Sequence, residues 1–428
     1  MKIAIVWLTT DLRIRDNETL IQAMAQADQI IPVVCLAPND LANTSFGFPK
    51  MGYFRMRFFF EALRDLDQQL RAQGSGLILS LESPEIAIPS LAKAYQAEYV
   101  YTKEQVGFEE LETQQKVREA LLPLQAVLET VNTFTLYHPE DLPFALSDLP
   151  DVFTKFRISQ EKNSKIRSRI EAPKSLNSPS IPALKIPSFS ELGIAEISLD
   201  ARSAFPLVGG ETAGQARLQD YLFGTRAALT YKETRNGLIG LDYSTKFSAY
   251  LAFGCLSARD IYWTLAQFES QVEANESTYW IKFELLWRDY FWFLMKKRPR
   301  SYFRPSGLLG SHPLHGLDPA ILATWVQGET GQLFIDANMR ELAETGFMSN
   351  RGRQNVASFF CHTLQQDWRY GAAYFESQLV DYDVSSNWGN WAYVAGVGND
   401  PRPDRRFNTE KQAEVYDPQQ TYQHLWLN

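Results

Sequence analysis

The chain opens on the apolar run Lys2-Ile-Ala-Ile-Val-Trp7, which has the composition of a buried β-strand. Similar runs recur downstream, separated by stretches with the periodicity of helices. Strands that alternate with helices form a parallel sheet with helices on both faces. Further strands are predicted at residues 30–36, 76–81, 98–102 and 127–132, and helices at residues 18–27, 53–72 and 85–95.

Residues 1–132 therefore predict an α/β domain of Rossmann-like type with a parallel sheet. The first strand is followed by Leu8-Thr9-Thr10-Asp11-Leu12-Arg13, and no GxGxxG fingerprint is present. A standard dinucleotide site is therefore not expected in this domain.

Residues 133–208 differ in composition from the segments on either side. Eight prolines lie between Pro139 and Pro206, and serines are dense among them. This composition predicts an interdomain linker with long irregular stretches. Residues 148–157 carry aromatic and aliphatic side chains that could anchor part of it.

Helical periodicity dominates residues 209–428, which predict an all-α domain. Strand signals are scarce there, and nine of the ten tryptophans of the chain lie beyond residue 260. The predicted helices lie at residues 213–225, 247–253, 258–268, 278–297, 332–345, 350–363 and 368–379.

The composition excludes several classes of protein. The 428 residues carry a net charge of −8, so any contact with nucleic acid must come from a local basic patch. The three cysteines lack the spacing of metal ligands, and neither a metal site nor a disulfide is expected. No signal peptide and no apolar stretch long enough to span a membrane is recognised, which favours a cytoplasmic protein.

Two segments carry hydroxyl, charged and aromatic groups in helical register. Tyr243-Ser-Thr-Lys-Phe-Ser248 places hydroxyls before a helical segment, which suits either a phosphate or a plain helix cap. In the second segment Glu284, Trp287 and Arg288 share one helical face. That face could belong to a site, or it could be an intrahelical ion pair beside a core tryptophan.

Two later segments have the same ambiguity. In Asn350-Arg-Gly-Arg353-Gln354, two amides and a guanidinium point the same way on a helix, as they would on a solvated face. The segment from Asp381 to Tyr393 combines acids, an amide and aromatics, typical of a loop that enters a helix beside a cavity. Its Asp-x-Asp pair lacks the further ligands of a metal site.

Together these segments resemble the photolyase/cryptochrome family, with Tyr231-Lys-Glu-Thr-Arg235-Asn-Gly and Gly346-Phe-Met-Ser as further matches. The linker motif Asp148-Leu-Pro-Asp-Val-Phe and the segment Tyr279 to Tyr290 resemble the DASH branch of that family. Gln354 and Tyr393 replace a methionine and a tryptophan of ordinary dimer photolyases, which is also typical of that branch.

The resemblance implies that the helical domain binds FAD in a bent conformation. Asn387 would face flavin N5, Arg353 and Asp381 would form an ion pair over the flavin, and Asp383 would accept from ring N–H groups. The implied FAD contacts are Tyr231, Ser244, Thr245, Lys246, Phe247, Ser248, Arg288, Asn350, Arg353, Asp381, Asp383 and Asn387.

The resemblance also implies light-driven repair of cyclobutane pyrimidine dimers by an electron from excited reduced FAD. Gln354 and Tyr393 would make the lesion pocket less apolar than in ordinary photolyases, which favours single-stranded DNA as partner. The implied pocket residues are Glu284, Trp287, Asn350, Gln354 and Tyr393. Candidates for the DNA-binding rim are Arg235, Arg351, Arg402, Arg405, Arg406, Lys411 and Gln412.

The family commonly reduces its flavin through three tryptophans, and Trp391 and Trp368 match the inner two. The position of the outer one is His315 in this chain, so a nearby tyrosine or tryptophan completes the path or photoreduction is slow. Trp391, Trp368 and Asn387 therefore join Glu284, Trp287 and Asn350 as implied catalytic residues. A methenyltetrahydrofolate antenna would contact Glu109 or Glu110, of which we favour Glu110.

Two hypotheses follow for the function. The first is a monomeric repair enzyme that acts on pyrimidine dimers in single-stranded DNA. The alternative is a blue-light photoreceptor that signals and has weak or no repair activity. An ordinary photolyase acting on duplex DNA is disfavoured by Gln354 and Tyr393.

Overall fold

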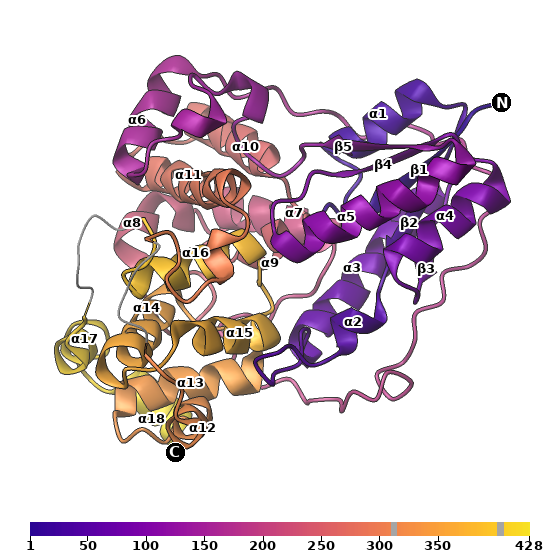
Figure 1. Cartoon of the computed structure of the whole chain (residues 1–428). Coiled ribbons are helices and arrows are strands. Elements are labelled where there is room, and N and C mark those ends of the chain that lie inside the picture. The colour runs from indigo at the N-terminus through magenta and orange to yellow at the C-terminus, as the bar shows by residue number, and fades with distance from the viewer. Residues whose placement is uncertain (310–314, 400–405) are drawn as a thin grey trace.

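The computed structural model of the chain describes residues 1–309, 315–399 and 406–428. Figure 1 shows a half built on a β-sheet, in indigo and violet, beside a larger half made of helices, in magenta to yellow. The α/β fold followed by an α-helical half confirms the predicted fold class. The predicted limits of the domains at residues 132 and 208 stay a prediction.

The sheet has five parallel strands in the order β3-β2-β1-β4-β5. This order puts β1 in the centre, where its residues 4–7 pair on both sides; Ala4, for example, lies opposite Ile30 and Tyr99. All five predicted strands are present, with the bounds β1 (Ile3–Leu8), β2 (Gln29–Cys35), β3 (Ile78–Ser80), β4 (Tyr99–Lys103) and β5 (Val127–Val131).

The two faces of the sheet belong to different hydrophobic cores. Ile5 and Trp7 of β1 lie in a small core under α4 (Pro84–Tyr95) and α5 (Phe108–Leu121). The alternate residues Ala4, Val6 and Leu8 lie in a large core that extends into the helical half. The helices α1 (Glu18–Gln26) and α3 (Tyr53–Ala72) contribute to this second core, and α2 (Pro38–Leu41) is a single turn. The sheet is therefore covered on both faces, and one face is shared with the helical half.

Helix α5 was not predicted from the sequence. Its fourteen residues bury only Gln114, Val117 and Leu121, and charged or amide side chains surround this narrow apolar stripe. The hydrophobic pattern of the segment was consequently too weak to mark a helix. The other predicted helices of this half, at 18–27, 53–72 and 85–95, correspond to α1, α3 and α4.

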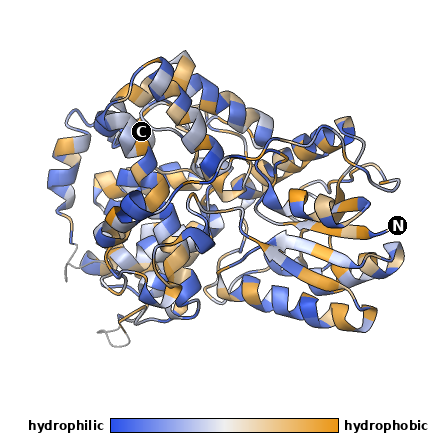
Figure 2. Ribbon diagram, turned by 90° about the horizontal axis from the view of Figure 1, so that it is seen from above, coloured by the Kyte–Doolittle hydropathy of each residue, from blue (hydrophilic) through white to orange (hydrophobic). Residues whose placement is uncertain are grey.

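The second half consists of helices in the part of the chain that the structure describes. Figure 2 shows hydrophilic and hydrophobic residues alternating along most of them, as expected for helices with one buried face. Two of them, α7 and α14, continue into π-helical turns at residues 220–224 and 359–363. The helices are α7 (Glu211–Gln219), α8 (Tyr231–Thr234), α9 (Ser248–Ala252), α10 (Ala258–Gln271), α11 (Glu276–Lys297), α12 (Pro319–Gln327), α13 (Leu333–Thr345), α14 (Asn350–Ser358), α15 (Trp368–Gln378), α16 (Val384–Val394), α17 (Thr409–Tyr416) and α18 (Thr421–Leu427).

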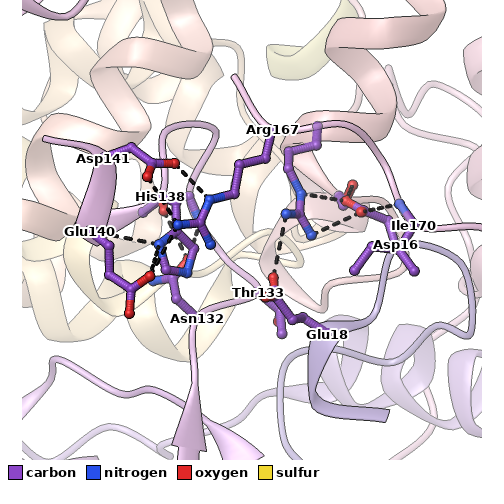
Figure 3. Close-up of polar contacts among 12 residues, drawn as sticks. Asp16, Glu18, Asn132, Thr133, His138, Glu140, Asp141, Arg167 and Ile170 are labelled. Carbon is purple, nitrogen blue, oxygen red and sulfur yellow. Dashed lines mark hydrogen bonds and ion pairs between the residues drawn. The ribbon is translucent and has the colours of Figure 1, made fainter. Parts of the chain in front are cut away.

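The connection between the halves is partly ordered. It contains α6 (Phe153–Asn163), whose Phe153 and Phe156 are buried, as the aromatic residues of that segment predicted. Residues 164–209 form no helix or strand, yet side chains tie them down. Arg167 forms ion pairs with Asp141 and Glu140, and Figure 3 shows its guanidinium between these two carboxylates.

The two halves are joined by buried hydrogen bonds around Arg13. Its guanidinium donates to the carbonyls of Gly254, Asp16 and Thr133, each at 2.9 Å, and its side chain is buried. Gly254 adopts φ +67°, and a Cβ there would lie 2.1 Å from the carbonyl oxygen of Thr10, so the approach requires glycine. The carboxyl end of β1 is thereby held against the helical half.

Candidate functional site

The predicted site residues gather on α8, α11, α14 and α16, together with the turn that precedes α9. Arg353 and Asp381 lie at the centre of this group. The Arg353 guanidinium contacts both carboxylate oxygens of Asp381, at 3.0 and 2.9 Å, and donates to the carbonyl of Met348. The Asp381 side chain is only 2% exposed, so this is a buried pair whose two members depend on each other.

The turn at residues 244–248 presents hydroxyl groups on a fixed backbone. The guanidinium of Arg217 donates to the carbonyls of Ser244 and Thr245, at 3.2 and 3.1 Å, and itself pairs with Asp242. Lys246 adopts a left-handed conformation with φ 60°, after which Phe247 is buried and Ser248 begins α9. Because α9 has only five residues, the turn can bind an anion through hydroxyl and N–H groups more than through a helix dipole.

Several buried polar atoms beside this turn have no hydrogen-bond partner among the described residues. The Lys246 amine is one, and it lies 3.3 Å from the centre of the Tyr243 ring. Burial lowers the pKa of Lys246 well below its ordinary value and raises that of Glu341 to about 7. The others are the Tyr243 hydroxyl, Asn338 Oδ1 and one oxygen of Glu341. Such atoms mark a region that a polar ligand or water would complete.

Helix α16 places its first residues toward the β-sheet. Asp383 caps the helix by accepting from the Ser386 N–H and the Ser385 hydroxyl, both at 2.7 Å. Its charge acts on two buried cations, Lys103 and Arg288. Burial nevertheless lowers the pKa of Lys103 to about 8 and that of Arg288 to about 10. The Asp383 carboxylate therefore lies near the cations of Lys103 and Arg288 where the two halves meet.

Asn387 lies one turn further along α16 and is buried. Its Nδ2 donates to the carbonyl of Ala372 at 3.0 Å, which assigns the side-chain oxygen to the other side of the amide. The residue can therefore present an acceptor to a ligand.

Helix α11 carries three of the predicted residues in different directions. Arg288 donates to the carbonyls of Phe134 and Leu251 and thus links α11 to the segment after β5 and to α9. Glu284 accepts from Arg235 of the segment after α8 at 2.6 Å, and burial raises the pKa of Glu284. Trp287 is half-buried. Glu284 and Trp287 thus remain on a common surface, while Arg288 turns toward the sheet.

Rings surround the Trp287 indole. Phe153 of α6 stacks on it with 3.7 Å between ring centroids and 11° between ring planes. Tyr393 of α16 meets it edge-on at 5.8 Å, and Phe291 stacks at 5.6 Å. The predicted pocket residues Trp287 and Tyr393 are therefore in contact, and a ring from the linker covers one indole face.

The remaining pocket and rim residues lie at the start of α14 and on neighbouring segments. Asn350 is exposed, and Arg351 donates to Gln354 at 2.9 Å and to Asn236 at 3.1 Å. Gln412 accepts from Asn355 at 3.3 Å, behind α14. Arg406 donates to the His362 carbonyl, Lys411 is exposed on α17, Tyr231 is buried at the start of α8, and Arg402 and Arg405 lie outside the described residues.

The two matching tryptophans are both buried. Trp391 packs edge-on against Phe375, Phe360 and Trp325, at 5.0, 6.1 and 6.2 Å. Trp368 donates its indole N–H to the Pro305 carbonyl at 2.9 Å and lies 5.8 Å from the ring of Trp388.

His315 lies close to Trp368 in the fold. The carbonyl of Gly316, the next residue, accepts from the N–H of Asp367, the residue before Trp368. His315 itself is exposed. It thus occupies a surface position beside the second tryptophan, although its side chain is not an aromatic electron donor.

Glu110 and Glu109 differ in how far their side chains are buried. Glu109 is largely exposed and pairs with Lys50 at 2.5 Å. Glu110 is half-buried against Gly107, and burial raises its pKa. A second buried carboxyl nearby, Glu376, has its pKa raised to about 7 by burial. Of the two candidates, Glu110 is therefore the one that points into the protein.

Sequence reasoning missed Phe153, Lys103 and Glu376 as neighbours of the site. Phe153 was recognised only as an anchor of the linker. Its partner Trp287 is 134 residues away, a relationship that no local pattern reveals. Lys103 ends a strand, where the carboxyl edge of a parallel sheet usually faces a ligand, so this position could have been found from the topology.

The comparisons with known proteins agree with this geometry. The family profile described as "DNA photolyase" matches residues 4–175, and that described as "FAD binding domain of DNA photolyase" matches residues 280–428. Cryptochrome DASH of Synechocystis is 46% identical over 425 residues, which cover 99% of this chain and 87% of that protein. The chain belongs to the photolyase/cryptochrome family, in its cryptochrome DASH branch.

Other DASH relatives and solved members of the family match over the full chain. Cryptochrome DASH of Gloeobacter violaceus is 44% identical and covers 100% of this chain and 85% of its own length. The solved Synechocystis cryptochrome has a TM-score of 0.96 at 45% identity and covers 100% of this chain and 89% of that one. A solved archaeal photolyase from Sulfolobus tokodaii, with two FAD molecules, has a TM-score of 0.80 at 26% identity and covers 100% of this chain and 90% of that one.

Family membership assigns FAD to the helical half, and the residues fit this cofactor. The turn at 244–248 offers hydroxyls and N–H groups to a diphosphate, and the unpartnered polar atoms beside it await further hydrogen bonds. Asn387 and Asp383 offer acceptors of the kind that ring N–H groups need. No described helix is long and apolar enough to cross a membrane.

Proposed function

We propose that the protein is a blue-light-dependent photolyase that splits cyclobutane pyrimidine dimers in single-stranded DNA. One observation carries this proposal: Glu284 and Trp287 lie on one face of α11, and Trp287 touches Tyr393. A pyrimidine base has a flat face, which can stack on an aromatic ring, and an amide edge, which can hydrogen-bond a carboxyl group. A carboxyl group beside two aromatic rings therefore suits a pair of such bases. The proposal rests on this arrangement together with family membership.

Bound FAD supplies the electron that splits the dimer after absorption of blue light. The chain's own residues hold the cofactor and adjust its surroundings. Arg353 and Asp381 form a buried pair that fixes α14 to the start of α16. Asn387 Oδ1 would accept a hydrogen bond from the bound cofactor, and Asp383 acts on the charges of Lys103 and Arg288.

The lesion binds where Trp287 and Tyr393 meet. Base–aromatic stacking contributes about 1–3 kcal/mol per base and accepts any pyrimidine. The Glu284 carboxyl hydrogen-bonds the amide edge of the dimer, where its oxygens can accept from an N–H group. Asn350, exposed at the start of α14, offers a further amide.

Single-stranded DNA is the favoured substrate because the pocket offers modest apolar burial. Gln354 is a polar residue engaged by Arg351, and Tyr393 carries a hydroxyl. Flipping a dimer out of a duplex costs a few kcal/mol, which this pocket compensates less than a more apolar one. In a single strand this cost is largely absent.

An antenna is the second part of the proposal. We assign methenyltetrahydrofolate as its chemical class and Glu110 as its contact. Glu110 is half-buried, whereas Glu109 is used by Lys50 at the surface. A carboxyl that faces inward can accept from the amino group of a pterin ring.

The experiment is a repair assay with the purified, reduced protein under blue light. A thymine dimer is offered in a single-stranded oligonucleotide and in the matching duplex, with a dark sample as control. Repair of the single strand with little repair of the duplex is expected. Equal repair of both would contradict the strand preference, and repair of neither would reject the enzyme and favour the light-sensing alternative.

A further inference from the structure

We infer that a second, aromatic surface next to the lesion pocket binds the bases that flank the dimer. This surface, the aromatic ledge, consists of Trp280 and Phe283 of α11 with Phe153 beneath them. The inference rests on the proposed function and deepens it, because it assigns a binding site to the undamaged part of the DNA strand.

The ledge continues the pocket without interruption. Trp280 and Phe283 are stacked, with 4.7 Å between ring centroids and 20° between planes. Phe283 meets Phe153 edge-on at 5.2 Å, and Phe153 stacks on Trp287 of the pocket. Trp287 follows Trp280 by seven positions, a rise of about 10 Å along the helix.

Trp280 and Phe283 of the ledge are half-buried, whereas Phe153 beneath them is buried. Residues 281, 285 and 286 turn inward and are buried, while Trp280, Phe283 and Trp287 keep part of their surface exposed. These rings pack against the large core and still keep part of their surface exposed, and a contiguous apolar surface of this kind can mark a contact with another molecule. The π-faces of nucleic-acid bases are the complement of such a row.

Cations line the same rings. Lys232 and Arg235 of the α8 segment lie 5.3 and 5.2 Å from the Trp280 ring, and Arg157 of α6 lies 5.7 Å from that of Phe283. A negatively charged chain with a net charge of −8 needs such a local cluster to approach phosphates. The cluster therefore favours a strand of nucleic acid over an apolar peptide.

Each of these cations has a carboxylate partner at present. Lys232 pairs with Glu276, Arg235 with Glu284 and Arg157 with Glu161. Ion pairs with an exposed member contribute only about 0–1 kcal/mol, so a phosphate can replace the carboxylate of Lys232 at small cost, whereas Arg157 and Glu161 are half-buried. Affinity on the ledge consequently depends more on stacking than on charge.

Stacking on the ledge requires unpaired bases. In a duplex the bases next to a flipped dimer stay paired with the opposite strand and stacked on their outer neighbours, which holds them in the helix and away from the ledge. In a single strand they are available to Trp280 and Phe283. The ledge thus gives the preference for single strands a second cause, independent of the polarity of the pocket.

The test compares substrates with and without flanking bases. Wild type, Trp280→Ala and Phe283→Ala bind, in the dark, a single-stranded oligonucleotide of about 16 nucleotides with one central thymine dimer. They also bind the isolated dimer dinucleotide, which has no flanks. We expect each variant to bind the oligonucleotide about tenfold more weakly and the dinucleotide as wild type does.

Further variants separate stacking from folding and from charge. Trp280→Phe keeps a ring and should bind nearly as wild type, and Tyr99→Ala removes a half-buried ring from the sheet domain as the matched control. Flavin content and thermal unfolding report on folding. In added salt the effect of Lys232→Ala should shrink, whereas that of Trp280→Ala should persist.

The outcomes distinguish the ledge from the repair function. Unchanged oligonucleotide affinity in both ring variants would overturn the ledge, even if wild type repairs the dimer. A loss that is equal for oligonucleotide and dinucleotide would also overturn it. Binding of undamaged single strands that falls in Trp280→Ala, without repair by wild type, would keep the ledge and reject the enzyme.

Discussion

The ring of Phe153 covers one face of the Trp287 indole, with ring centroids 3.7 Å apart and planes nearly parallel. Phe153 belongs to the linker, and Trp287 belongs to the longest helix of the helical half. A residue outside the predicted site therefore holds a pocket ring in place, which leads to the first prediction.

Phe153→Ala should weaken binding of the dimer dinucleotide about five- to tenfold, because an unsupported indole stacks poorly. It should also lower the free energy of unfolding by about 3–5 kcal/mol, the usual loss for a buried phenylalanine. Phe153→Leu is the matched control, since it restores apolar volume without a flat face. A leucine variant with both wild-type stability and wild-type affinity would refute the role of stacking.

Glu284→Gln should leave flavin content unchanged and lower the quantum yield of repair about tenfold, as expected when a charged or acidic hydrogen bond to the dimer is lost. The yield is measured under blue light with saturating single-stranded substrate. Arg235→Ala serves as the comparison, because it removes the partner of Glu284 and keeps the carboxyl. An equal loss in both variants would mean that Glu284 acts only through its ion pair.

Asp381→Asn should abolish most flavin binding. The change leaves Arg353 without its carboxylate, and breaking a buried pair costs about 3–5 kcal/mol. Absorption of the purified protein in the visible region gives the flavin content. Asp200→Asn breaks a surface pair with Arg202 and should keep the flavin. Full occupancy in Asp381→Asn would contradict the placement of this pair at the cofactor.

His315→Trp should accelerate photoreduction of the flavin. The position is exposed and, through Gly316, lies beside the segment that carries Trp368, so an indole there can supply the missing outer donor. Trp368→Phe and Trp391→Phe should slow the reaction, which is followed by absorption under blue light with an external reductant. No acceleration in His315→Trp would show that another residue already completes the path.

Glu376→Gln should stabilise the protein increasingly as pH rises. Burial holds the pKa of Glu376 at about 7 in the folded state, against 4.5 in the unfolded chain. The native state thus binds more protons between these values, and this contribution to stability is lost as pH rises through the window. Glutamine does not titrate, so the difference in free energy of unfolding should grow by about 1–3 kcal/mol from pH 4.5 to 8. A difference in free energy of unfolding that did not change with pH would contradict the raised pKa of Glu376.

Much of the fold followed from local patterns. The five strands and the helices α1, α3 and α4 were predicted because apolar runs and periodic faces mark buried elements directly. Helix α5 was not predicted because only a narrow stripe of its residues is buried. For the linker the sequence predicted only an irregular segment, from its composition. The contacts that order it, such as Arg167 with Asp141, join residues far apart in the chain, so no local pattern predicts them.

The site was predicted as a set of segments, and the structure adds how they meet. Arg353 with Asp381 was expected as an ion pair, and it is present. Arg288 lies one turn after Glu284 on the same helix, as expected, and its guanidinium reaches the carbonyls of Phe134 and Leu251. Helical spacing alone does not say which neighbour a long side chain reaches, so such directions depend on tertiary contacts.

The hydrogen bonds around Arg13 limit how far one half of the molecule can move against the other. Three carbonyls from separate segments accept from one buried guanidinium, and Gly254 is in contact with the loop after β1. The bond to Gly254 crosses between the halves, as does that from the Leu12 N–H to the Phe253 carbonyl, and a swing of one half against the other would break these two bonds. A change in the helical half that moved it against the sheet would therefore have to break buried hydrogen bonds, whereas a rearrangement of surface segments would leave them intact.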